Sequence, residues 1–174
     1  MDIDNIYIEC NMINKDSTEI PVMDGSGSPF ASIIQQVGLK DQSEPKIYLK
    51  YKNPIFDMSD NDGHRIEVSP SDELKITMNI NSSHPLILNQ SYTISITAQS
   101  YIKEISTARH YYIEEQGMLY KEYMRGMSTL NTIILGDKTI VNPEGLRMPD
   151  EFVRHQILDF LGDLALIGRP VLGH

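Results

Sequence analysis

The chain has 174 residues, a hydrophobic content of 40%, a formal net charge of −9 and a single cysteine, Cys10. One cysteine excludes an internal disulfide and a cysteine-based metal cluster, and the negative charge argues against nucleic acid as a partner. Because no apolar stretch is long enough to span a membrane and the start has no signal-peptide pattern, the sequence predicts a globular protein of the reducing cytoplasm.

The first forty residues are predicted to form a strand, a loop and a helix. Isoleucines alternate with polar residues in residues 3–10, which is typical of a half-buried strand. After a turn-rich loop, Ser28 and Pro29 suit the start of a helix over residues 30–37, and Gly38 would end it. A unit this small cannot bury its own apolar face, so we expect it to pack on the rest of the chain or on a missing partner segment.

The loop before this helix contains glycines and serines, as phosphate-binding loops do. It lacks the Gly-Lys-Ser/Thr ending of such loops. We therefore interpret it as a structural turn, in which Asp24 and Ser26 bond nearby amides and Gly25 supplies an unusual backbone angle.

After a polar linker at residues 41–45, residues 46–174 are predicted to form a second unit. Its expected strands cover residues 46–51, 64–69, 74–80, 91–97, 108–113, 132–135 and 138–141, with a hairpin turn at 57–63. Its expected helices cover residues 98–105, 118–124 and 149–167. This order predicts an α+β fold, with helices on one face of a mainly antiparallel sheet.

The last predicted helix carries a line of polar side chains. His155, Asp159 and Asp163 are four residues apart, and residues at this spacing share one face of an α-helix. An imidazole and a carboxylate one turn apart can bind the same divalent ion. Spacing alone favours an exposed polar stripe or a simple histidine–carboxylate pair. The apolar residues around the line predict a buried helix, however, and buried carboxylates need a partner or a metal.

The other histidines are weaker candidates for a site. His64 follows a predicted turn and is expected to be solvated, and His84 precedes a proline, where a structural hydrogen bond is expected. His110 could reach the polar line, whereas His174 is expected to be frayed. Two arginines are possible anion contacts, although surface arginines are common: Arg109 and Arg147.

Several segments of the chain resemble one known family. They are Ile3-Asp-Asn-Ile, Glu19-Ile-Pro-Val-Met-Asp-Gly-Ser, Ser83-His-Pro-Leu, Ile105-Ser-Thr-Ala-Arg and Glu144-Gly-Leu-Arg-x-Pro-Asp-Glu-Phe-Val-Arg-His-x-Ile-Leu-Asp-x-Leu-Gly-Asp-Leu. Over the whole chain, their order and spacing resemble UDP-3-O-acyl-N-acetylglucosamine deacetylases. The resemblance implies a zinc-dependent enzyme of lipid A synthesis, which removes acetate from a UDP-linked acylated glucosamine.

The resemblance also implies a fold and a set of site residues. The family fold has two similar domains, each a sheet layered against helices, with the active site between them. Residues 1–40 would be the end of the first domain, and residues 46–174 the second domain without its C-terminal end. His155 and Asp159 match two of the three zinc ligands, and Asp163 matches the aspartate that orients a catalytic histidine.

The chain departs from the family pattern at several positions. The third zinc ligand and the general base form a Glu-His pair that would lie upstream of Met1, and the catalytic histidine belongs to a Lys-Ser-Gly-His motif that His174 does not match. Gln156 stands where the family usually has a lysine, and His110 where a threonine helps stabilise the oxyanion. The segment at residues 126–131 is shorter than its counterpart, which borders the acyl-chain passage.

These departures predict a fragment that is inactive by itself and binds zinc weakly at most, because two ligands rarely hold the metal. A missing segment or a second subunit would complete the fold. The alternative is a non-catalytic deacetylase-like domain that binds a nucleotide-sugar, an acyl chain or a protein partner. The motif match argues against a structural interaction module with an incidental polar stripe.

Overall fold

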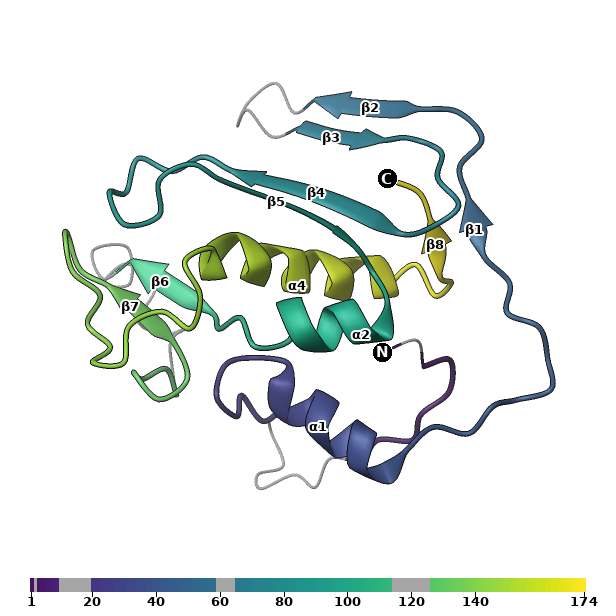
Figure 1. The fold of residues 1–174 in the computed structure, drawn as a ribbon, viewed down its shortest axis with the longest axis horizontal. Coiled ribbons are helices and arrows are strands. Elements are labelled where there is room, and N and C mark those ends of the chain that lie inside the picture. Colours follow the sequence, from purple (N-terminus) through teal and green to yellow (C-terminus); the bar gives the residue numbers. More distant parts are fainter. Residues whose placement is uncertain (2, 10–19, 59–64, 114–125) are drawn as a thin grey trace, which may run out of the picture.

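The computed structural model describes residues 1, 3–9, 20–58, 65–113 and 126–174 of the chain (Figure 1). Helix α4 (Glu151–Ala165) runs through the middle of the molecule. The hairpin of β4 (Lys75–Ile80) and β5 (Gln90–Ser95) packs on α4, and so does η1 (Tyr101–Ile105), which continues the short helix α2 (Ala98–Ser100). Helix α1 (Ser28–Val37) lies at the outer side of α2 in Figure 1. This arrangement confirms the predicted α+β class.

Strands within the described residues form four two-stranded pairs rather than one continuous sheet. Two pairs are antiparallel: β2 (Ile55–Met58) with β3 (Arg65–Val68), and β4 with β5. Two are parallel: β1 (Leu49–Lys50) with β8 (Val171–Leu172), and β6 (Tyr111–Ile113) with β7 (Ile133–Leu135). The prediction of a mainly antiparallel sheet is therefore right for the hairpins and wrong for the pairs that join distant segments.

Two clusters of buried side chains flank the first half of α4. In the β4–β5 hairpin, Ile76 lies opposite Ile94, and both pack with Ile157 of α4. The second cluster brings Ile133 and Phe152 together at the start of α4. Burying each such side chain contributes about 1.5–3 kcal/mol. The first half of α4 is therefore fixed from two sides.

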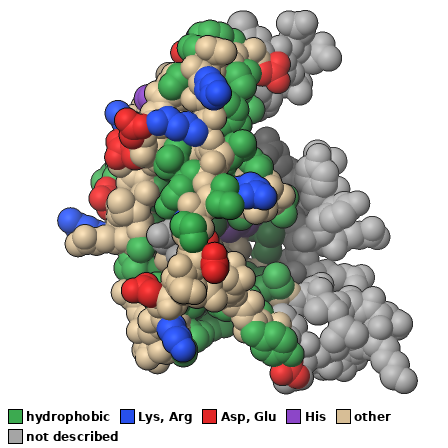
Figure 2. Space-filling view, turned by 90° about the vertical axis from the view of Figure 1, so that its right-hand side faces the viewer, with side chains coloured by type: hydrophobic (Ala, Val, Ile, Leu, Met, Phe, Trp, Pro, Cys, Tyr) green, Lys and Arg blue, Asp and Glu red, His purple; other side chains and the backbone are tan. Residues whose placement is uncertain are grey.

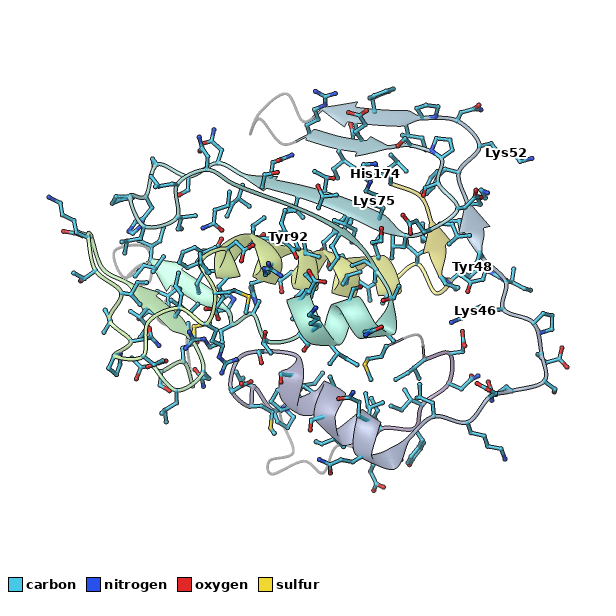
Figure 3. All side chains as sticks on the ribbon, viewed as in Figure 1. Lys46, Tyr48, Lys52, Lys75, Tyr92 and His174 are labelled. Carbon is cyan, nitrogen blue, oxygen red and sulfur yellow. The ribbon has the colours of Figure 1, made fainter. Side chains whose placement is uncertain are left out.

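The C-terminal segment inserts between β1 and β4. The amide of Leu49 donates to the carbonyl of Pro170 (2.8 Å), and the amide of Lys75 donates to that of Gly173 (2.9 Å). The prediction that His174 is frayed is wrong. Its backbone amide donates a hydrogen bond to the carbonyl of Ser69, and its ring Nε2 lies 2.9 Å from the hydroxyl of Thr77. Figure 3 shows His174 beside the sheet, near Lys75.

The strand predicted at residues 3–10 is absent from its described part, residues 3–9. Ile6, Tyr7 and Ile8 are exposed there instead of alternating between two faces. A strand needs a hydrogen-bonding neighbour, and within the described ranges no other strand pairs with this segment. Residues 1–40 as a domain remnant, residues 41–45 as a linker and residues 46–174 as a second domain remain predictions.

Other differences concern the ends of predicted elements. The turn predicted at residues 57–63 begins too early, because Asp57 and Met58 belong to β2. Residues 138–141 contribute only an isolated bridge between Ile140 and Leu135, because the segment is too short to form a ladder. The helix predicted at residues 118–124 lies outside the described residues.

Two predicted helices are confirmed with changed details. Helix α1 ends at Gly38, whose φ of 82° suits glycine, but Gly27 rather than Ser28 precedes the first turn. The helix predicted at residues 98–105 starts as α2 and continues as the π-helical η1, in which the amide of Ser106 donates to Tyr101 (2.7 Å).

The face viewed in Figure 2 mixes hydrophobic side chains with both kinds of charge. Exposed apolar residues also mark α1 and the segment after it, including Ile33, Val37 and Leu39. In the described parts of the chain, no helix is long and apolar enough to cross a bilayer.

Candidate metal centre

The start of α4 is fixed by a buried ion pair. Glu151 is the first residue of the helix and has no exposed surface. Its carboxylate accepts hydrogen bonds from the backbone amide and Nε of Arg109 (3.1 and 2.9 Å) and from the amide of Arg147 (2.6 Å). The carboxylate of Glu151 therefore joins α4 to the segment before β6.

Arg109 uses its remaining donors inside the protein as well. Nη1 donates to Glu144 (2.6 Å) and Nη2 to the carbonyl of Gly145 (2.7 Å). Burial by itself would lower the pKa of Arg109, but the hydrogen bonds and charges of Glu151 and Glu144 raise it, so the side chain stays charged. The interpretation of Arg109 as an anion contact is therefore wrong, because its donors already have partners.

Arg147 connects the loop before α1 to the same region. It donates to Asp24 (2.8 Å) and to the carbonyl of Thr107 (2.9 Å). Asp24 in turn accepts from the hydroxyl of Ser26 (2.8 Å), as expected for a structural turn. Gly25 has a φ of 77°, and a Cβ built there would lie 1.7 Å from the carbonyl oxygen of Asn131. The loop is therefore a structural turn, as predicted, with Asp24 and Ser26 accepting from the amides of Ser26 and Ser28.

His155 lies one turn after Glu151 and is 4% exposed. Its Nδ1 lies 3.2 Å from the carbonyl oxygen of Ala108. A carbonyl only accepts hydrogen bonds, so Nδ1 carries a proton in this contact, and the lone pair of the neutral ring is then on Nε2. A backbone carbonyl is one of the partners that orient a metal-binding histidine, along with carboxylates and water.

The carboxylate of Asp159 places a second possible metal-ligand atom beside that lone pair. Its Oδ2 lies 3.4 Å from Nε2 of His155, and half of its side-chain surface is exposed. Two ligands of a tetrahedral zinc, each about 2.0–2.1 Å from the ion, lie about 3.3–3.5 Å apart. The observed separation fits this arrangement and is longer than N–H···O hydrogen bonds usually are. The spacing of His155 and Asp159 is compatible with two ligands of one zinc ion, and their assignment as metal ligands stays a prediction.

Asp163 does not share this environment. It is exposed, and its carboxylate makes no hydrogen bond or ion pair with the residues that the structure describes. The fully buried residues of α4 end at Ile157, and Gly162, Asp163 and Ala165 are exposed. The prediction that the whole helix is buried is therefore wrong for its second half.

The ring of His110 contacts His155, next to Asp159. The sequence predicts that His110 could reach the polar line but not how the two rings lie. Its Nδ1 lies 3.3 Å from Nε2 of His155, and the two rings meet edge to face with centroids 5.2 Å apart. In the described part of the chain, no group of three or more histidine, cysteine, aspartate or glutamate side chains is already arranged to hold a metal ion.

Polar contacts on both sides of α4 support the orientation of this helix. Gln156 Nε2 lies 3.5 Å from the hydroxyl of Tyr111. Arg154 Cζ lies 3.8 Å from the ring centroid of Tyr92 on β5, which Figure 3 shows over α4. Arg154 also donates to Asp150 (2.8 Å) and to the carbonyl of Glu104 (2.9 Å). These contacts limit rotation of the helix that carries His155.

Of the remaining histidines, His64 lies outside the described residues. His84 makes the expected structural contact, because its Nδ1 accepts from the amide of Leu86 (3.3 Å). The buried pair of Arg109 and Glu151 is the main feature that sequence reasoning missed. Hydrophobic patterns give no sign that a charged residue is buried, and the two residues are far apart in the chain.

Comparison with known proteins identifies the family. The sequence model of UDP-3-O-acyl N-acetylglycosamine deacetylase (LpxC) matches residues 1–174, the whole chain. The chain belongs to this deacetylase family. It is 39% identical over 181 residues to the UDP-3-O-acyl-N-acetylglucosamine deacetylase of Syntrophus aciditrophicus, and 39% identical over 176 residues to those of Myxococcus xanthus and Neisseria gonorrhoeae.

These matches cover 98–100% of the chain but 54–55% of the relatives. The chain thus spans about half the length of the deacetylases that it matches. The resemblance inferred from its motifs is confirmed, and the family is one of enzymes. Which residues of this chain bind metal or take part in catalysis is a separate question, addressed by the geometry of α4.

Proposed function

We propose that this chain carries the metal-binding helix of a zinc-dependent deacetylase that hydrolyses the N-acetyl group of UDP-3-O-acyl-N-acetylglucosamine in lipid A synthesis. The observation that carries the proposal is the spacing of 3.4 Å between His155 Nε2 and Asp159 Oδ2. The contact of His155 Nδ1 with Ala108 supports it, because in the neutral ring this contact places the lone pair on Nε2. Family membership supports the substrate class.

In this proposal the two ligands have different roles. His155 is held in a buried position, so its ring needs little reorganisation when the metal arrives. Asp159 supplies negative charge from the more exposed side, which offsets part of the charge of the ion. Zinc, when bound, lowers the pKa of a water molecule and polarises the amide carbonyl.

Asp163 is proposed to orient a catalytic histidine rather than to bind metal. It lies one turn beyond Asp159, and its exposed carboxylate is available to a side chain from another segment. An aspartate that accepts a hydrogen bond from an imidazole fixes the tautomer of that ring. The proposed partner histidine is not among the residues of this chain.

The general base, the acid and a further ligand are proposed to come from polypeptide beyond these 174 residues, either another segment or a second subunit. The length of the relatives supports this division, because the chain covers about half of each. We expect the isolated chain to release no acetate, since binding zinc alone does not move protons to the leaving group.

The test combines metal binding with turnover on the full chain. Isothermal titration with zinc is expected to show binding that is lost in both His155→Ala and Asp159→Ala, whereas Asp137→Ala serves as a matched surface control. Unchanged zinc binding in His155→Ala would contradict the metal assignment. Acetate release from UDP-3-O-acyl-N-acetylglucosamine by the purified chain with zinc would contradict the division of catalytic groups. Binding of the nucleotide-sugar without any zinc binding would favour the non-catalytic alternative.

A further inference from the structure

The last two residues of the chain lie between β3 and β4 and pair with both sides. The amide of His174 donates to the carbonyl of Ser69 (2.9 Å), directly after β3, and the amide of Ser69 donates back to His174 (2.7 Å). On the other side, Gly173 donates to the carbonyl of Glu73 (3.1 Å) and accepts from the amide of Lys75 on β4 (2.9 Å). The end of the chain therefore enters the space between β3 and β4, as Figure 1 shows.

On β3, the backbone groups that face this space form a free edge. Alternate residues of an antiparallel strand direct both the amide and the carbonyl to the same neighbour. Ser69 directs its groups to His174, so Glu67 and Arg65 direct theirs to the same side. Among the described strands, β3 pairs with β2 alone, on its opposite side. A free edge of this kind is a template for another strand.

The edge of β4 that faces β3 is free in the same way. The amide of Lys75 bonds the end of the chain, so the amides of Thr77 and Asn79 point to the same side. The residues between them face β5, as the bond from the amide of Ile96 to the carbonyl of Leu74 shows. Neighbouring strands lie about 4.8 Å apart. Because the last two residues pair with both edges, the space has the width of one strand where they enter it.

One face of this space is apolar. Gly173 is bridged to Leu74, and a Cβ built on Gly173 would lie 3.7 Å from the side chain of Val68 on β3. Val68 therefore lies on the same face as Leu74 and as Ile76, two residues further along β4. Ile76 is 5% exposed, whereas Ile66, the next residue of β3 on this face, is 55% exposed. A side chain placed between the two strands would cover Ile66.

The opposite face is polar. The hydroxyl of Thr77 lies 2.8 Å from that of Thr93 on β5 and 2.9 Å from ring Nε2 of His174. Successive side chains of a strand point to opposite faces. A strand that fits this space therefore alternates, with apolar side chains beside Ile76 and polar side chains beside Thr77.

We propose that the space bounded by residues 65–69 and 73–79, the β3–β4 slot, binds one extended strand, and that this strand is the polypeptide that follows β8 in a longer protein. Strand β8 already enters the slot in the required direction, since its bridge to β4 is parallel. The chain covers 54–55% of the length of its relatives, which supports further polypeptide as the occupant. The inference goes beyond the proposed function and is independent of the metal site.

The existing bonds fix the register of the added strand. Its first and third residues would bond β4, and their carbonyls would accept from the amides of Thr77 and Asn79. Its second and fourth residues would pair with Glu67 and Arg65 on β3. The strand would run parallel to β4 and antiparallel to β3, and it would join the β2–β3 and β4–β5 pairs into one sheet.

The test extends the full chain by six residues that alternate valine and threonine, beginning with valine, and measures amide hydrogen exchange by NMR. The amides of Glu67 and Thr77 are expected to exchange at least about 10-fold more slowly in the extended chain, because each gains a hydrogen bond inside a sheet. The amides of Val68 and Ile76 already face a paired strand and are expected to change less.

Two further extensions of the same length are the controls. Proline in place of each valine removes the amides that would donate to β4, so this extension is expected to leave the exchange of Thr77 unchanged. An extension that begins with threonine turns its valines to the polar face, and it is expected to protect Glu67 and Thr77 less than the first extension does. Thermal unfolding checks that every variant is folded.

Four results would overturn the inference. The first is unchanged exchange of Glu67 and Thr77 in the chain with the valine-first extension. The second is equal protection by the proline extension or by the threonine-first extension. The third is protection in the chain without an extension at every concentration, which would mean that β3 and β4 pair directly. The fourth is protection that rises with protein concentration together with a dimer, which would make a second copy the occupant. None of these results affects zinc binding by His155, so the proposed function is tested separately.

Discussion

The two halves of helix α4 differ in burial, although both are rich in apolar residues. The first half is enclosed, with Phe152 and Ile157 completely buried. The second half opens to solvent, where Gly162, Asp163 and Ala165 are exposed. His155 belongs to the enclosed half and Asp159 to the open half, so the proposed metal site lies at the boundary. His155, in the enclosed half, is held in one orientation by its surroundings. Asp159, in the exposed half, leaves room for a substrate beside the proposed metal site.

Breaking the ion pair at the start of α4 is expected to have the largest effect. Glu151→Ala leaves Arg109 charged and buried without its main partner, and the loss of one member of a buried pair costs about 3–5 kcal/mol. The free energy of unfolding, measured by urea denaturation, is expected to fall by this amount. Glu67→Ala is the control, because it breaks an exposed pair with Arg65 that contributes about 0–1 kcal/mol. Equal losses in the two variants would show that the buried pair is not special.

The contrast in packing between the two halves gives the second prediction. Phe152→Ala removes a completely buried ring from the cluster at the start of α4 and is expected to destabilise the protein by about 3 kcal/mol or more. Leu166→Ala, at the residue that follows the exposed end of α4 and is 86% exposed, is expected to change stability by less than about 0.5 kcal/mol. Thermal or urea denaturation of both variants checks the difference. A large loss in Leu166→Ala would mean that another surface covers this end in solution.

The ion pair between Asp24 and Arg147 joins the loop before α1 to the region of the site. Breaking it is expected to lower the free energy of unfolding by a smaller amount that depends on pH. Burial by itself would raise the pKa of Asp24, but hydrogen bonds from Arg147 and Ser26 and the charge of Arg147 together lower it. The folded protein therefore holds the ionised form, and the stabilisation is present above the ordinary pKa of Asp, about 3.9. It is lost as the pH falls through the lowered folded value, because the unfolded chain takes up the proton first.

Asp24→Asn is the variant that tests this link. It is expected to lose about 1 kcal/mol or less at pH 7, since Asp24 and Arg147 are each about one-third exposed. The difference from the wild type should shrink toward pH 3 in urea denaturation experiments. A difference that stays constant between pH 7 and pH 3 would exclude ionised Asp24 as its source.

The smallest change is expected at the end of the polar line. Asp163→Asn alters an exposed carboxylate and should change stability by less than about 0.5 kcal/mol. Zinc affinity of the chain should be unchanged as well, whereas Asp159→Asn should reduce it. Equal losses of zinc affinity in the two variants would assign Asp163 to the metal and contradict its proposed orienting role.

The sequence predicts those parts of the fold that depend on local patterns. The last helix is predicted within two residues of its observed ends, Glu151 and Ala165, because its apolar period and its breakers are strong. The β4–β5 hairpin follows from alternation, with Ile76 and Ile94 on the buried face. Strand β8 cannot be predicted, since two residues carry no period and the pairing partner lies far away in the chain.

In the candidate site, too, local patterns predict some features and tertiary contacts decide the others. Helical spacing correctly groups His155 and Asp159, but it also groups Asp163, which lies in a different environment. Which part of a helix is covered depends on tertiary packing, so the pattern does not locate the boundary. The contact between His110 and His155 likewise depends on how the segment before β6 lies against α4, and this is fixed by a buried salt bridge that no hydrophobic pattern reveals.

The most direct test of the metal site is nitrogen NMR of the histidine side chains during zinc titration of the full chain. Nδ1 of His155 is predicted to be protonated throughout, because it contacts the carbonyl of Ala108. Zinc is predicted to shift the Nε2 resonance of the same ring, which His155→Gln assigns by removing it. If zinc leaves both nitrogens of His155 unchanged, or if it binds Nδ1 instead, helix α4 does not carry the metal ligands proposed for it.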